Sequence, residues 1–261
     1  MSGIQAPDKE TMEACRLYVD NLIKPIHSLG KLEDIAVRLA GITGKIKPGK
    51  LNKAIIIMAG DTAVDGENKT GGKTSLTEVQ MVSRGLGTVS AVARTLGAQV
   101  YLIDVGLEQN TNDIEGVLTN KVVYGTHRGN PALDQDAVSA AISIGMSVAR
   151  TLAVQGIQAV GLGNIGERSL LSALGVTAAI MKKELQENSL KDGFSLHMDD
   201  VGNMANDPVG VLSRVGSAEI AGLFGLVVQA AREKIAIVFD NAVTGAAVLA
   251  AIEVYPEVRD Y

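Results

Sequence analysis

The chain has 261 residues, of which 46% are apolar and only 3% aromatic, and its formal net charge is −5. These values allow a large aliphatic core, and they argue against a nucleic-acid partner, which would favour basic and aromatic side chains. The single cysteine, Cys15, excludes an internal disulfide framework. No continuous apolar run reaches the ~18 to 20 residues of a transmembrane helix, and the N-terminus lacks a signal layout. We therefore expect a cytoplasmic protein with no membrane partner.

The N-terminal segment predicts a pair of helices. Apolar spacing indicates one helix from Asp8 to Ile23, which Pro25 ends, and Ser28 is expected to cap a second. The buried stripe of this second helix is expected to comprise Leu29, Leu32, Ile35, Ala36 and Leu39. A linker rich in Gly, Pro and Lys follows from Gly41 to Lys53. We therefore expect a helical subdomain over residues 1–48 and a second domain over residues 49–261.

The second domain alternates apolar runs with helical patterns. The runs are typical of strands buried on both faces: Ala54–Gly60, Gln99–Gly106, Ile157–Leu162 and Ile235–Asp240. Helices are expected over Thr74–Leu96, Pro131–Gln155, Ser213–Arg232 and Val243–Val254, and a short strand over Lys121–Tyr124. This alternation predicts an α/β fold, a doubly wound parallel sheet with helices on both faces.

Three predicted strands end in an acid, at Asp61, Asp104 and Asp240. An Asp at this position commonly caps the following turn or helix, which gives it a structural role. Together, however, the three would ring the carboxyl edge of the sheet, where open α/β folds bind ligands. A ribose or a heterocyclic base would find hydrogen-bond acceptors there.

One segment fits the pattern G-x-G-x-x-G, with glycines at Gly161, Gly163 and Gly166. We expect a glycine turn that leads from the strand ending at Leu162 into a helix and offers backbone N–H groups to a phosphate. A dinucleotide site also needs an acid about 20 residues later, at the tip of the next strand. Glu184 and Glu187 fall instead in a charged segment without strand pattern. A phosphate or sugar-phosphate site of another kind is favoured over a dinucleotide-dependent oxidoreductase, and a plain structural turn stays open.

Six segments, in order along the chain, carry motifs of one known family. Residues 24–33 resemble "KPxGSLGxLE", 58–64 "ADHGV", 97–106 "GAxVxVIDVG", 161–171 "GxGELGxANTT", 211–222 "VLxxVGGFDIxGM" and 237–241 "vlLDGF". These motifs belong to the nicotinate-nucleotide:dimethylbenzimidazole phosphoribosyltransferase family, known as CobT. The resemblance spans nearly the whole chain.

The resemblance implies a Rossmann-like parallel sheet with a small helical domain, and usually a dimer. It also implies transfer of phosphoribose from nicotinate mononucleotide to an aromatic nitrogen base, the future lower ligand of cobamides. His27, His127 and His197 lack metal-ligand spacing with one another or with Cys15, so we expect neither a metal nor a cofactor. The expected substrate-binding residues are Asp61, Glu78, Gln80, Gly163, Asn164, Gly166, Ser169 and Asp240. For Glu78 and Gln80, ordinary helix-surface polarity explains the residues equally well.

The sequence departs from the family at positions that carry chemistry. The family's general base is a Glu in a Gly-rich stretch near its C-terminus, and no residue up to Tyr261 matches it. The family's His in "ADHGV" is Thr62 here, and its two Thr after the glycine turn are Leu170 and Leu171, which donate no hydrogen bond. Losing a positioned general base typically costs ~10²- to 10⁴-fold in rate.

Two functions within this resemblance therefore stay open. One is a phosphoribosyltransferase of lower-ligand activation. The other is an inactive paralogue that binds a base or nucleotide, or that forms a heterodimer with a full-length homologue. Without the family's C-terminal helices, an apolar patch would be exposed around Leu22, Leu29, Leu32 and Ile35, which predicts a homodimer or another partner.

Overall fold

A five-stranded parallel sheet forms the centre of the molecule. The computed structural model describes residues 3–63, 73–127, 131–183 and 207–261. The strand order is β4-β3-β1-β6-β7, and the strands comprise β1 (Lys53–Gly60), β3 (Ala98–Gly106), β4 (Val117–Thr119), β6 (Ala159–Ile165) and β7 (Ala236–Val238). All four pairings are parallel. Two short strands, β2 (Thr62–Ala63) and β5 (Thr126–His127), pair beyond the carboxyl end of the sheet.

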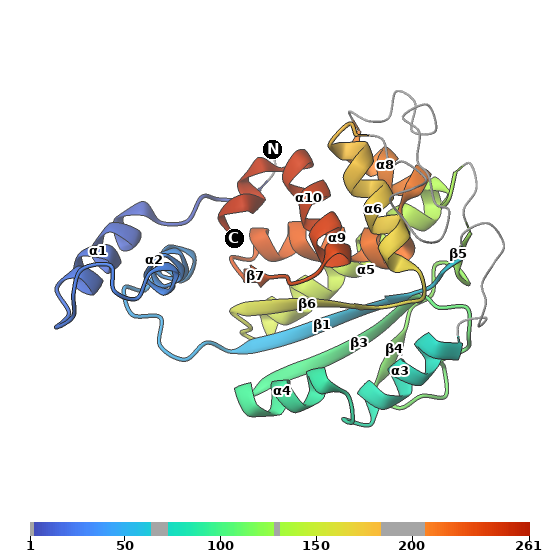
Figure 1. Ribbon diagram of the computed structural model, residues 1–261, viewed down its shortest axis with the longest axis horizontal. Coiled ribbons are helices and arrows are strands. Elements are labelled where there is room, and N and C mark those ends of the chain that lie inside the picture. The colour runs from blue at the N-terminus through green and yellow to red at the C-terminus, as the bar shows by residue number, and fades with distance from the viewer. Residues whose placement is uncertain (1–2, 64–72, 128–130, 184–206) are drawn as a thin grey trace.

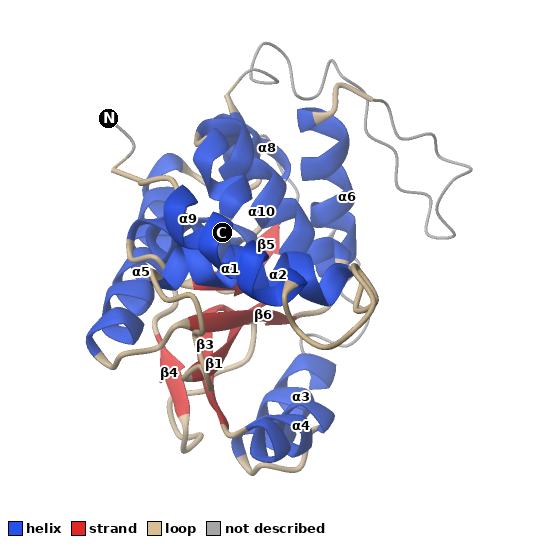
Figure 2. Ribbon diagram, turned by 90° about the vertical axis from the view of Figure 1, so that its left-hand side faces the viewer, coloured by secondary structure: helices blue, strands red, loops and turns tan. Residues whose placement is uncertain are grey.

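Helices cover both faces of this sheet, which confirms the α/β prediction. On one face lie α3 (Lys73–Ser83) and α4 (Thr88–Leu96), next to β3 in Figure 1. On the other face lie α5 (Gln135–Val154), α6 (Ser169–Ile180), α8 (Pro208–Val215), α9 (Ala218–Arg232) and α10 (Ala242–Val254). Figure 2 shows the same layers from the side, with α3 and α4 on one side of the strands and the larger group on the other.

The layer formed by α3 and α4 leaves part of its face of the sheet uncovered. In the described residues, α3 and α4 pack against part of one face of the sheet, where Ile57, Val79 and Leu102 share a core cluster. The opposite face holds a much larger core that includes Ile56, Met58 and residues of all five helices on that side. On this face Gly161 and Gly163 of β6 are only half-buried, and Val238 of β7 is 60% exposed.

Glycines set the close packing of the larger layer. A Cβ at Gly145 of α5 would lie 1.9 Å from the carbonyl oxygen of Gly222 in α9, and a Cβ at Gly225 would lie 2.1 Å from that of Ile142. The two backbones touch where a side chain would normally separate them. This contact explains how a chain so poor in aromatic residues fills its core with small aliphatic side chains.

Several predicted boundaries are wrong for identifiable reasons. The helix expected over Thr74–Leu96 is two helices, because the chain turns at Gly85, which has a φ of +73°. The helix expected over Ser213–Arg232 is likewise divided, with Ser217 preceding α9. The short strand expected over Lys121–Tyr124 lies earlier, at β4.

The N-terminal helices form the predicted pair, α1 (Lys9–Asp20) and α2 (Lys31–Thr43). They lie side by side to the left of the sheet in Figure 1. The predicted cap at Ser28 is wrong, since α2 begins at Lys31 and is preceded by Gly30, with a φ of +55°. The predicted buried stripe is also wrong at three positions, because Leu29, Leu32 and Ile35 are each more than half exposed. The buried positions of α2 are Glu33, Val37, Ala40, Gly41 and Ile42.

Residues near the two ends of the described chain pack together on the α/β body. Ile4 belongs to the main core cluster, and the Tyr261 hydroxyl donates a hydrogen bond to the carbonyl oxygen of Gln5. The residues at the start of the chain therefore pack with the C-terminal residues of the larger domain. The division of the chain at residue 48 stays a prediction.

Helix α5 is long and apolar enough, by length and composition, to cross a membrane, and in the described ranges no other helix is. The sequence expectation missed it because its apolar character comes from Ala, Val and Ile interleaved with Ser and Gly. Its inward side packs along α9, with Val138, Ala141 and Ala149 fully buried. A core helix passes the same test, so this feature alone does not indicate a membrane.

Candidate functional site

A cavity of about 640 Å³ opens on the half-covered face of the sheet. Its floor consists of β1 and β6, one wall consists of α3 and α4, and the segment after β7 forms the opposite rim. The volume lies within the range of about 300 to 1,000 Å³ that is usual for small-molecule sites. Most of the lining is apolar and includes Ile55, Ile57, Met81, Val82 and Phe239.

Two glycines of the G-x-G-x-x-G pattern make this hollow. Gly163 was expected in a turn after the strand, but it lies with Gly161 inside β6, and the two pair with Ile57 and Ile55 of β1. Both glycines line the cavity. A Cβ at Gly161 would make an ordinary contact of 3.5 Å with Ile55, so the fold itself would accept a side chain there. The glycines therefore keep the floor low enough for a flat ligand to lie on it.

Polar groups converge at the rim of the cavity. Glu78 of α3, Asn164 of β6 and Asp240 after β7 all line it, and their contact with substrate stays a prediction. The side-chain amide of Asn241 donates to Asn164 Oδ1 at 3.2 Å and lies 3.3 Å from Asp240 Oδ1. Asn241 Oδ1 also accepts the backbone N–H groups of the first turn of α10. The position of this amide is therefore fixed by the fold, and it holds the two sides of the rim together.

The structure places Gln80 elsewhere. Its side chain lines a second hollow, between α3 and residues 110–116, together with Arg84, Asp113 and Glu115. Gln80 and Glu78 lie only two positions apart in a helix, so they point to different sides. Of the two, only Glu78 borders the cavity.

Asp61 is buried just beyond β1, and its carboxylate is occupied by the chain itself. Oδ1 accepts from the Ser75 hydroxyl at 2.5 Å and from the Glu167 backbone N–H at 2.9 Å, and Oδ2 accepts from the Glu108 backbone N–H at 3.0 Å. The side chain ties α3 to the loops that follow β3 and β6 at the carboxyl edge of the sheet. It does not line the cavity, and a contact with substrate stays a prediction.

Gly166 and Ser169 also lie near the carboxyl end of β1, and neither residue lines the cavity. A Cβ at Gly166 would lie 1.9 Å from the carbonyl oxygen of Gly60, so only glycine allows this approach. Ser169, the first residue of α6, is buried, and its hydroxyl lies 3.4 Å from the same carbonyl. Both residues lie where the segment after β6 passes close to the end of β1. Their role in binding substrate stays a prediction.

A buried acid that was not among the predicted site residues, Glu219, lies close to Gly60 at the end of β1. Glu219, in the first turn of α9, is fully buried, and its Oε1 accepts from the Ser217 hydroxyl at 2.7 Å. Its Oε2 has no hydrogen-bond partner in the described residues. Burial raises the pKa of Glu219 to about 7, and the nearby Asp61 charge also raises this pKa. The sequence signal was its place in the segment 211–222, but burial of the carboxyl depends on tertiary packing.

Asp104 shows the structural role that strand-end acids often have. It accepts the backbone N–H of Leu107 at 2.9 Å and forms an ion pair with Lys121 at 2.7 Å. Neither Asp104 nor Asp61 lines the cavity, whereas Asp240 does. The predicted ring of three acids is therefore divided, with one at the cavity and two inside the fold.

Comparisons with known proteins agree with this architecture. The sequence model of a phosphoribosyltransferase family matches residues 4–261. A nicotinate-nucleotide–dimethylbenzimidazole phosphoribosyltransferase of Alkaliphilus metalliredigens is 34% identical, over 99% of this chain and 79% of that protein. The chain belongs to this phosphoribosyltransferase family. A relative of the same name from Acetivibrio thermocellus is 33% identical over 97% of this chain and 77% of its own length.

A solved structure extends the agreement to three dimensions. The crystal structure of the nicotinate-nucleotide–dimethylbenzimidazole phosphoribosyltransferase from Thermus thermophilus superposes with a TM-score of 0.85 at 26% identity. It covers 97% of this chain, which in turn covers 80% of the Thermus chain. The position of Gly161 and Gly163 within a strand does not support the oxidoreductase interpretation.

Proposed function

We propose that this member of the family binds nicotinate mononucleotide and an aromatic nitrogen base, and transfers the phosphoribosyl group to the base. The observation that carries the proposal is the cavity floored by Gly161 and Gly163. A flat heterocycle fits between this floor and the apolar wall of α3 and α4. Phe239 and Met81 border the same space and offer apolar contact to a ring.

The rim supplies the polar contacts that such a base needs. Glu78 and Asp240 are exposed carboxyl groups at the cavity, and either accepts a hydrogen bond from a ring N–H. Asn164 adds an amide whose oxygen is already oriented by Asn241. Orientation of the attacking nitrogen is a large part of catalysis when a cationic ribosyl centre develops as nicotinate leaves.

A second candidate function follows from residues at the start of α6. The family pattern has two Thr where this chain has Leu170 and Leu171, and Leu171 is buried while Leu170 is half exposed. Neither side chain gives a hydrogen bond to a phosphate or ribose. This favours a chain that binds the base but turns over little alone, as an inactive paralogue or as the partner of a full-length homologue.

The experiment that separates these functions is calorimetric titration with nicotinate mononucleotide and then dimethylbenzimidazole, run beside an assay for α-ribazole phosphate. Binding of both with turnover supports the transferase. Binding of the base without nucleotide binding or turnover supports the second function. Binding of neither contradicts both.

We also propose that the chain functions as a homodimer or as a heterodimer with a homologue, in the cytoplasm. The support for a partner is the exposed patch on the helical pair, Leu22, Leu29, Leu32 and Ile35, each at least 40% exposed. The single cysteine is free and buried, in keeping with a reducing compartment.

A further inference from the structure

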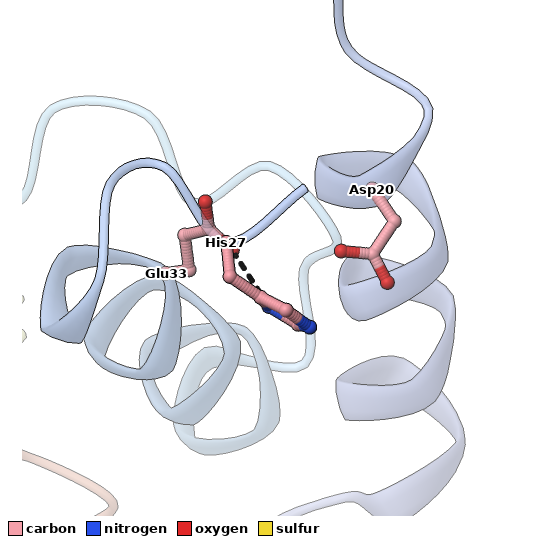
Figure 3. A group of neighbouring side chains, drawn as sticks. All are labelled: Asp20, His27 and Glu33. Atoms are coloured by element: carbon pink, nitrogen blue, oxygen red, sulfur yellow. Dashed lines mark ion pairs between the residues drawn. The ribbon is translucent and has the colours of Figure 1, made fainter. Parts of the chain in front are cut away.

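The loop between α1 and α2 carries a group of side chains that the proposed transfer reaction does not use. Asp20 ends α1, His27 lies in the loop, and Glu33 lies in the first turn of α2. One ligand atom from each residue lies within 4.8 Å of the other two. Figure 3 shows the imidazole of His27 between the two carboxyl groups. None of the three residues lines the cavity on the sheet.

Two of these oxygens are buried without a hydrogen bond. Asp20 Oδ1 and Glu33 Oε2 are shielded from solvent and have no hydrogen-bond partner in the described residues. Glu33 as a whole is only 2% exposed. Buried carboxylate oxygens are normally satisfied, so each such exception calls for an explanation, such as an ion.

The backbone of His27 is also unusual. Its φ is +60°, in the left-handed region that favours glycine. The family pattern "KPxGSLGxLE" has Gly at this position, so this chain places an imidazole where the backbone alone would favour Gly. A side chain kept in an unfavourable conformation suggests that the side chain itself has a role.

The spacing of the group suits a metal ion. His27 Nδ1 lies 3.5 Å from Glu33 Oε2. Two ligands of a tetrahedral ion with bonds of about 2.1 Å are separated by about 3.4 Å. Lys24 Nζ lies 2.9 Å from the other oxygen, Glu33 Oε1, and so leaves Oε2 free to bind. With Lys24 included, the two carboxylates leave a net negative charge for a dication.

We propose that Asp20, His27 and Glu33 bind a divalent transition-metal ion of the zinc class, with water completing the coordination. One imidazole and two carboxylates favour zinc or a similar ion over calcium or magnesium, which prefer oxygen ligands alone. The bound ion joins the end of α1 to the start of α2 and fixes the loop between them. Spacing among His and Cys residues alone does not reveal this group, because two of its three members are carboxylates.

The test uses the full chain, free of any affinity tag, titrated with zinc by calorimetry and with cobalt by visible absorption. We expect one ion per chain and the d–d bands of a low-symmetry cobalt site. H27G removes the imidazole and suits the left-handed backbone, so the variant is expected to fold at least as well. H27G and D20N are each expected to weaken zinc binding at least about 100-fold, more than the loss of an outer-shell partner costs.

D34N is the matched control, because Asp34 is the neighbour of Glu33 in α2 but directs its carboxylate to Arg16, 3.0 Å away. This variant removes one local negative charge and should bind zinc nearly as the wild type does. Thermal unfolding gives an independent readout: zinc should raise the Tm of the wild type and of D34N, but not that of H27G. Equal zinc affinity in H27G and the wild type would overturn the proposal. Absence of zinc binding by the wild type would also overturn it and would reduce the group to an ordinary ion-pair network.

Discussion

The carboxylate of Asp61 accepts the backbone N–H of Glu167 at 2.9 Å, although 106 positions separate the two residues in the chain. This bond joins the end of β1 to the loop that follows β6. Because the same carboxylate also holds Ser75 and Glu108, one buried side chain sets the spacing of the loops at the edge of the sheet. Ser75 belongs to α3, which also carries Glu78 at the cavity.

We predict that D61N destabilises the protein by about 2 kcal/mol, because an amide offers one acceptor atom where the carboxylate offers two. Urea unfolding at neutral pH measures this change. D240N, which alters an exposed acid at the cavity, is the control and should leave stability nearly unchanged. A D61N protein of wild-type stability with weakened substrate binding would instead assign Asp61 to the substrate.

Glu219 should make stability depend on pH. Its pKa is about 7 in the folded protein and 4.5 is its usual value, so between these values the folded state holds a proton that the unfolded chain has released. Stability is therefore lost as pH rises from about 4.5 to about 7, by about 3 kcal/mol in total.

E219Q removes this titration and keeps the size of the side chain. We predict that the difference in unfolding free energy between E219Q and the wild type shifts in favour of the variant across that pH range. Urea unfolding at several pH values measures the difference, and E253Q, which removes an exposed carboxyl, is the control. A difference that stays constant with pH would show that Glu219 is ionised throughout.

Sequence patterns predicted the sheet well because its central strands are buried on both faces. The runs Ala54–Gly60 and Gln99–Gly106 match β1 and β3 within one residue at either end. Patterns failed where burial depends on a neighbour. Helical spacing favoured Leu29, Leu32 and Ile35 as the buried side, but the buried residues of α2 lie on another side. They include Glu33, which forms an ion pair with Lys24.

The sequence also predicted the candidate site only in part. Glu78, Gly163, Asn164 and Asp240 line one cavity although they come from three different parts of the chain, and their contact with substrate stays a prediction. The letters of G-x-G-x-x-G, however, do not reveal that the strand continues through its second glycine. Glu184, Glu187 and His197 lie outside the described residues, and the side chain of His127 does too.

The exposed patch on the helical pair predicts self-association. We expect sedimentation velocity to show a dimer or a larger species, and L32K to shift it toward the monomer, because a charge at Leu32 would be desolvated in an interface. V154K is the matched control, since Val154 is 90% exposed and lies at the end of α5, outside the patch. A wild-type protein that stays monomeric at high concentration would contradict the prediction.

The central claim is that the cavity floored by Gly161 and Gly163 holds the aromatic base, and filling that floor tests it most directly. G161V adds a side chain that the strand accepts, with its Cβ at an ordinary distance from Ile55, while G175A adds a methyl group within α6 as the control. The measurement is calorimetric binding of dimethylbenzimidazole to the three proteins. We predict saturable binding by the wild type and by G175A, and binding at least about tenfold weaker by G161V, which corresponds to about 1.4 kcal/mol. Equal affinity in all three proteins would contradict the assignment of the cavity.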